Sequence, residues 1–190
     1  MEFLDWELPS HHFSDTLSVD PFSFDTQQQP LLTRCLRFPL NPYETALVPL
    51  EQITEVSEVN PTAILTVPEL PAWVLGIYHW RGEMLWLVDL NQLVGYPSVW
   101  QRQPLSTAPM MLVVQVNHQA IGIVVPQVND MELHPLEQMQ PAAPGLFSSS
   151  LLPLISGVLP DCGDPVLNLS AIALSPLWKK YQGVNAGFSS

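Results

Sequence analysis

The stretch that decides the fold is Gly76-Ile77-Tyr78-His79-Trp80-Arg81-Gly82-Glu83-Met84-Leu85-Trp86-Leu87-Val88-Asp89-Leu90. Two runs of apolar, aromatic and β-branched residues flank the pair Arg81-Gly82, and this pattern predicts two strands joined by a tight turn. Alternate residues of a strand point to opposite faces, and both faces of the second run are mostly apolar in its middle. We therefore predict a hairpin with one arginine at its tip, in a chain that has only six Lys and Arg residues.

Short apolar runs bounded by Pro, Gly, Asn or Asp continue on both sides of this hairpin. Twenty prolines interrupt nearly every window that could hold a long helix. The chain is therefore expected to form mostly short strands, and about ten of them fit one or two small barrels. The expected strands are 33–38, 45–49, 53–58, 63–67, 74–80, 84–88, 110–116, 120–125, 128–133, 155–159 and 165–169.

A few local signals predict turns and short helices between these strands. Asp89 is placed to cap a helical turn that ends at Gly95. Ser175-Pro176 has the pattern of a helix start, and the helix would run to Tyr181. Residues 117–119 and 161–164 have the composition of hairpin loops.

The composition limits the kinds of partner. The formal net charge is -12, which disfavours nucleic acid and anionic membrane surfaces and favours protein partners. Cys35 and Cys162 lie far apart, form no CxxC pattern and are too few to staple a secreted scaffold. No secretory signal and no apolar run of about 20 residues is visible. We expect a soluble, cytoplasmic protein.

Residues 1–30 differ from the rest of the chain. They hold six acids and no Lys or Arg, and they end in Gln27-Gln28-Gln29-Pro30. Their apolar residues follow no sustained period, which is typical of a mobile acidic tail. Either this tail is simply solvated, or it is a partner-binding segment that uses Phe22 and Phe24. Residues 182–190 are expected to be frayed.

The sequence holds little that indicates catalysis. It has no Walker loop and no GxSxG, HExxH or GxGxxG motif. None of the five histidines is spaced with Cys or carboxylates as a metal ligand would be. Asp161 and Asp164 flank a turn, where Asp is common for backbone reasons. We expect no catalytic, cofactor-binding or metal site.

The same hairpin resembles the signature of the CheW family of bacterial chemotaxis coupling proteins. The resemblance rests on Gly76, Arg81, Gly82 and the run 87–90, and it extends from about residue 31 to residue 181. Further similar segments follow in the family's order: 45–56, 71–73, 120–130, 155–157 and 165–169. The chain departs from the family pattern at Leu75, where a basic residue is common, and at Pro126-Gln127, where Asp-Gly is common.

The resemblance implies an all-β fold of two packed SH3-like five-stranded β-barrels with short helices. It implies a cytoplasmic, non-catalytic adaptor without cofactors, recruited to membrane-bound receptor arrays. Its partners would be the regulatory domain of a CheA-type histidine kinase and the cytoplasmic tip of a methyl-accepting chemoreceptor. The departures suit a divergent paralogue, similar to the CheW-like proteins of type IV pilus motility or phototaxis.

On the matching positions, four residues form the expected partner-binding site: Arg81, Gly82, Glu55 and Trp80. Arg81 would face the receptor or the kinase, where it could pair with a carboxylate, and Glu55 would lie at the receptor-contact groove. Gly82 would supply backbone freedom at the turn. Trp80 is an interface anchor if it is exposed and a core residue if it is not.

These assignments have structural alternatives. Arg81 could instead hold the turn through Glu83 or Asp89, and Glu55 could be a solvated strand residue. At the level of function, the alternative is a β-barrel that binds a peptide or regulator in another pathway. An enzyme of unrecognised type is disfavoured because no nucleophile–base arrangement is present, and a nucleic-acid barrel is disfavoured by the charge.

Overall fold

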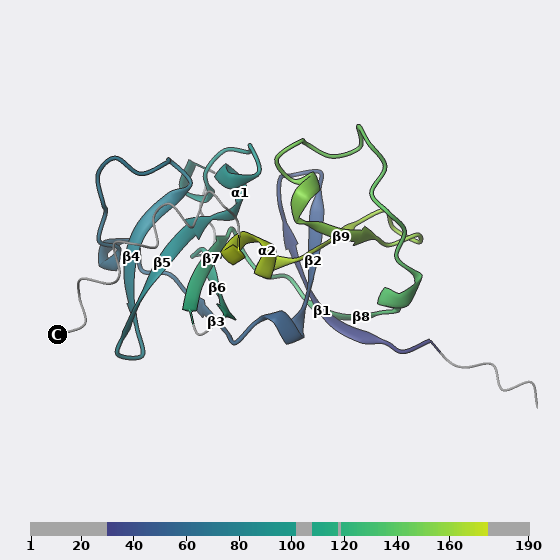
Figure 1. Ribbon diagram of the computed structural model, residues 1–190, viewed down its shortest axis with the longest axis horizontal. Helices are drawn as coiled ribbons and strands as arrows, with labels where there is room; N and C mark the ends of the chain where they lie inside the picture. The colour runs from purple at the N-terminus through teal and green to yellow at the C-terminus, as the bar shows by residue number, and fades with distance from the viewer. Residues whose placement is uncertain (1–29, 102–107, 118, 175–190) are drawn as a thin grey trace, which may run out of the picture.

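The computed structural model describes residues 30–101, 108–117 and 119–174. These residues form two β-rich lobes that lie side by side, with a short helix between them (Figure 1). Each lobe holds one five-stranded sheet. The predicted all-β fold with short helices is therefore confirmed.

The first sheet takes strands from both ends of the described chain. It consists of β1 (Thr33–Pro39), β2 (Thr45–Pro49), β8 (Met131–His134), β9 (Ile155–Val158) and β10 (Pro165–Leu167), in the spatial order β8-β1-β2-β10-β9. β1 pairs antiparallel with both β2 and β8, whereas β10 runs parallel to β2. The chain thus leaves this lobe after β2 and returns to it at β8.

The second sheet is formed by the chain between those two crossings. It consists of β3 (Glu55–Glu58), β4 (Val74–Trp80), β5 (Glu83–Asp89), β6 (Met110–Val116) and β7 (Gln119–Val125), in the order β3-β6-β7-β5-β4. β4 and β5 form the predicted antiparallel hairpin, and β5 pairs parallel with β7. β3 and β4 are the two outer strands of this sheet.

The helical elements are short. Their bounds are η1 (Leu50–Gln52), η2 (Pro61–Ala63), α1 (Leu90–Leu93), η3 (Val99–Gln101), η4 (Leu136–Gln138), η5 (Leu152–Leu154) and α2 (Leu169–Leu174). In Figure 1, α2 lies between the two lobes. No helix among the described residues is long and apolar enough to cross a membrane.

The largest apolar core is shared by the two sheets. Leu36 and Phe38 of β1 belong to the same buried cluster as Trp86 and Val88 of β5. The alternate residues Leu85 and Leu87 point the other way, into a separate core of the second lobe. The central strands are therefore apolar on both faces because one face fills a barrel and the other joins the two barrels. Each fully buried side chain of this size contributes about 1.5–3 kcal/mol.

Most of the strand predictions are confirmed, although β3 begins at Glu55 instead of residue 53 and β8 spans Met131–His134 instead of 128–133. Two other segments differ more. Residues 63–67 do not form a strand: Asn60 caps the turn η2 by accepting a hydrogen bond from Thr62 N at 3.1 Å, and only Leu65 then makes a single β-bridge, to Ile77. Pro61 and Pro68 flank this segment and prevent a longer ladder. The strand predicted for 165–169 ends at Leu167, and the unpredicted helix α2 begins at Leu169.

The structure tests part of the predicted loops but not the predictions for the two ends of the chain. The predicted loop 161–164 joins the antiparallel pair β9 and β10. Of the predicted loop 117–119, Asn117 follows β6, Gln119 already begins β7, and residue 118 lies outside the described residues. The acidic segment 1–29 lies outside the described residues, as do the predicted helix at 175–181 and the expected frayed end at 182–190.

Candidate interaction site

The site begins with the turn between β4 and β5. Trp80 pairs with Glu83 across a two-residue loop in which Arg81 has φ 48° and Gly82 has φ 87°. Two successive residues in the left-handed region define the type I′ turn that fits the twist of a hairpin. Gly82 adopts this conformation freely, but Arg81 adopts it at a cost of about 1–2 kcal/mol. The chain thus holds a strained residue at an exposed hairpin tip.

Arg81 pairs with Glu55, which lies on the opposite edge of the same sheet. The Nη2 atom of Arg81 and the Oε2 atom of Glu55 are 2.6 Å apart, without a well-aligned hydrogen bond between them. The Arg81 side chain is 71% exposed, whereas that of Glu55 is 23% exposed. Because β3 and β4 are the outer strands of the sheet, this ion pair spans the two edges that meet when the sheet curls into a barrel.

The side chain of Trp80 packs against the guanidinium of Arg81. The Cζ atom of Arg81 lies 5.4 Å from the centroid of a Trp80 ring, within the range of a cation–π contact. Trp80 is half-buried and packs against the core of the second lobe. Its indole N–H is buried and has no acceptor among the described residues. The aromatic ring therefore lies against the guanidinium of Arg81, and the role of Trp80 as an interface anchor stays a prediction.

Gly76 lets a neighbouring segment cross the hairpin. A Cβ atom at this position would lie 2.2 Å from the carbonyl oxygen of Leu65, and its φ is 137°. The N–H groups of Leu65 and Ile77 donate to each other's carbonyl oxygens at 2.8 and 2.9 Å. Only glycine allows two backbones to approach this closely. This contact explains why residue 76 is glycine, which the sequence motif alone did not explain.

Asp89 does not belong to the tip. It is fully buried, caps α1 by accepting a hydrogen bond from Gln92 N at 3.2 Å, and also accepts from Ser98 Oγ at 2.6 Å and Val99 N at 3.1 Å. The predicted cap is confirmed. Of the two partners considered for Arg81 within the chain, Asp89 is engaged elsewhere and Glu83 makes no ion pair among the described residues. The ion-pair partner of Arg81 is Glu55.

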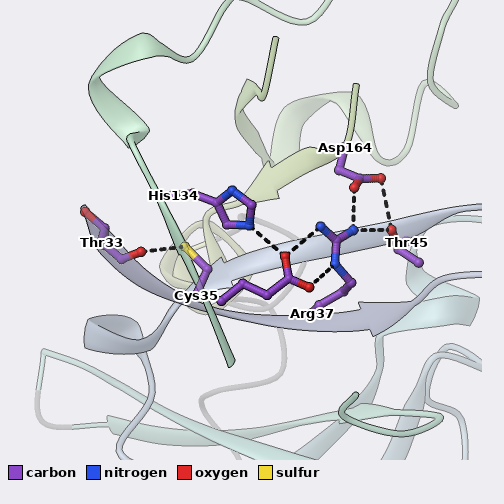
Figure 2. A network of polar contacts seen from close by, with 7 residues as sticks. Thr33, Cys35, Arg37, Thr45, His134 and Asp164 are labelled. Carbon is purple, nitrogen blue, oxygen red and sulfur yellow. Dashed lines mark hydrogen bonds and ion pairs between the residues drawn. The ribbon is translucent and has the colours of Figure 1, made fainter. Parts of the chain in front are cut away.

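A second polar cluster lies in the first lobe, and the sequence did not predict it. Figure 2 shows Arg37 of β1 with both ends of its guanidinium engaged. Arg37 donates to Glu132 through Nε at 2.6 Å and through Nη2 at 2.9 Å, and its Nη1 donates to Thr45 Oγ1 at 2.9 Å and to Asp164. The hydroxyl of Thr45 donates to Asp164 Oδ1 at 2.9 Å, and His134 Nε2 lies 2.8 Å from Glu132 Oε2.

This Arg37 cluster joins β1, β2, β8 and the loop before β10. Hydrogen bonds from Arg37 lower the pKa of Glu132 to about 2. Burial alone would raise the pKa of Asp164, but hydrogen bonds from Arg37, Cys162 and Thr45 hold it below its usual value. The pKa of Arg37 is raised, chiefly by its hydrogen bonds to Glu132. The nearby Cys35 is buried, which raises its pKa to about 11 and keeps it a neutral thiol.

No group of three or more His, Cys, Asp or Glu side chains among the described residues is placed to hold a metal ion. In the Arg37 cluster the carboxylates are already held by an arginine and a threonine, so the cluster ties strands together. The tip differs because its cation is exposed and has N–H groups available to a partner.

Two packed SH3-like barrels with a cationic hairpin tip define a binding scaffold. A family model for the CheW-like domain matches residues 34–176. The chain therefore belongs to the CheW-like family and is a coupling adaptor. A solved structure with the same fold is the scaffolding protein TtCheW from Thermoanaerobacter tengcongensis, with 18% sequence identity, a TM-score of 0.60, and coverage of 74% of this chain and 86% of that chain. No curated protein sequence matches the chain.

Proposed function

We propose that this chain is a non-catalytic adaptor that couples the cytoplasmic tip of a methyl-accepting chemoreceptor to the regulatory domain of a CheA-type histidine kinase. Binding to the receptor would recruit it to membrane-bound receptor arrays. One observation supports the location of the contact: a single, highly exposed guanidinium stands at the hairpin tip of a chain with net charge -12.

The geometry of the tip suits recognition of a carboxylate. Glu55 and Trp80 hold the guanidinium in place, so a partner does not need to order a freely rotating side chain. An arginine can offer a pair of parallel N–H groups to a second carboxylate while it keeps the first. Gly82 beside it has no atom within 4 Å of the space a Cβ would fill, so the approach to the tip is open.

Calorimetric titration with the regulatory domain of a CheA-type kinase and with a receptor-tip fragment from the same cell tests this proposal. Arg81→Glu should weaken binding to at least one of them by tenfold or more, which is about 1.4 kcal/mol. Lys180→Glu is the matched control, because it makes the same charge change outside the segment 34–176 that the family model matches. Equal weakening by both substitutions would show a net-charge effect and would contradict a contact at the tip.

A further inference from the structure

An exposed apolar surface lies at the edge of the first sheet, whereas the hairpin tip belongs to the second sheet. β8 is an outer strand, and in it Met131 is 56% exposed and Leu133 is 57% exposed. They stand opposite Leu36 and Arg34 of β1, and residues directly opposite in an antiparallel pair point to the same face. Leu32, which is 51% exposed, follows the same alternation.

We define the β8 patch as Leu32, Arg34, Met131 and Leu133. Arg34 is exposed and makes no ion pair with any described residue. The patch is therefore a set of three large apolar side chains around one unpaired cation. An outer strand with exposed apolar residues is a hazard for aggregation unless something covers it. The positive charge of Arg34 favours a covering segment that is both acidic and apolar.

The chain itself contains such a segment directly before the patch. Residues 20–25 read Asp-Pro-Phe-Ser-Phe-Asp, with two phenylalanines between two carboxylates. Residues 1–29, which hold all six acids of this end of the chain and no Lys or Arg, precede the first described residue, Pro30. Arg34 follows Pro30 by only four positions in the sequence, and it pairs with Leu133 of β8. Figure 1 shows β8 beside β1 in this part of the molecule.

The length of the chain permits the contact. The five residues from Asp25 to Pro30 can span up to about 17 Å. The patch extends over about four residues of strand, or roughly 13 Å at the usual rise. A reversal of the chain within residues 26–30 would therefore bring Phe22 and Phe24 over Met131 and Leu133.

We propose that residues 20–25 of this chain bind the β8 patch, with Phe22 and Phe24 on its apolar side chains and a flanking carboxylate on Arg34. The segment then covers the outer strand and withholds this face from other proteins. This inference is independent of the proposed receptor and kinase contacts, because both groups that meet belong to the same chain.

Methyl NMR of the full chain labelled with 13C at its methionine methyl groups tests the contact. The signal of Met131 is assigned by its loss in Met131→Leu. Nearby aromatic rings shift a methyl signal, so the double substitution Phe22→Ser/Phe24→Ser should move the Met131 signal. Met84, which is 47% exposed on the other lobe, should not move and serves as the internal reference.

The matched control is Phe3→Ser/Phe13→Ser, which removes two phenylalanines from the same end of the chain and should leave Met131 unchanged. Arg34→Glu should move the Met131 signal in the same direction as the loss of Phe22 and Phe24. A Met131 signal that is identical in both double variants would overturn the proposal. So would a difference that disappears on dilution, because the segment would then come from a second copy.

Discussion

Replacing Arg37 with Met should destabilise the first lobe far more than the loss of an exposed ion pair would. The substitution keeps most of the side-chain volume but removes the cation that holds Glu132 and Asp164. These carboxylate side chains are 31% and 20% exposed, so solvent can compensate only part of the loss. Breaking a buried pair costs about 3–5 kcal/mol, and the partial exposure reduces our expectation to about 2–4 kcal/mol.

Urea unfolding at pH 7, followed by circular dichroism, measures this loss. In thermal unfolding, a loss of about 2–4 kcal/mol corresponds to a fall in Tm of roughly 4–16 °C for a chain of this size. Arg34→Met is the control, since it removes an exposed arginine from the same strand and should cost no more than about 1 kcal/mol, the size of an exposed ion pair. Equal effects of the two substitutions would refute the role given to the Arg37 cluster.

The cluster also predicts a pH dependence with a definite sign. The pKa of Glu132 is about 2 in the folded chain against an ordinary value of 4.5, and that of Asp164 is also lowered. A lowered pKa contributes stability that is fully present above the ordinary value and is lost as the pH falls toward the folded value. Wild-type stability should therefore decline between about pH 5 and pH 2, and Arg37→Met should decline less steeply. Parallel curves would contradict this assignment.

Four further substitutions concern the hairpin or a residue that contacts it, and urea unfolding measures each. Gly76→Ala should destabilise the protein by about 3 kcal/mol or more, because its Cβ would clash with the carbonyl of Leu65. Gly82→Ala should cost only about 1–2 kcal/mol of backbone strain, and equal losses at the two glycines would rule out the clash. Asp89→Ala should cost about 2–3 kcal/mol, since it removes a helix cap and leaves Ser98 Oγ and Val99 N without their acceptor. A loss below about 0.5 kcal/mol, the size of an ordinary surface change, would show that these hydrogen bonds contribute little to stability. Glu55→Gln should cost less than about 1 kcal/mol, because its partner Arg81 is highly exposed, and a loss above 2 kcal/mol would mean that the pair holds the barrel together.

The sequence predicted the parts of this fold that depend on neighbours along the chain. The pair Arg81-Gly82 between two apolar runs was sufficient for the hairpin, and Asp89 was sufficient for the cap of α1. The apolar faces of β5 were also visible in the alternation of residues. Helix α2 was missed because residues 165–169 have a strand-like composition, although Asn168 accepts a hydrogen bond from Ala171 N at 3.2 Å and was a signal for a helix start.

The contacts between distant segments could not be predicted in the same way. Arg81 and Glu55 meet only because the sheet curls and brings its two outer strands together. Arg37 and Glu132 are 95 positions apart in the sequence, and nothing local to either residue identifies the other. What could have indicated the cluster is a charge in the middle of a short strand, Arg37 in β1 and Glu132 in β8, because a half-buried charge requires a partner.

The most direct test of the adaptor role is a reconstitution with vesicles that carry the chemoreceptor. We predict that a CheA-type kinase sediments with these vesicles only when this chain is present, and that Arg81→Glu strongly reduces the sedimented kinase while Lys180→Glu does not. Kinase that sediments equally without the chain, or a chain that binds neither receptor nor kinase, would contradict the claim that it couples the two.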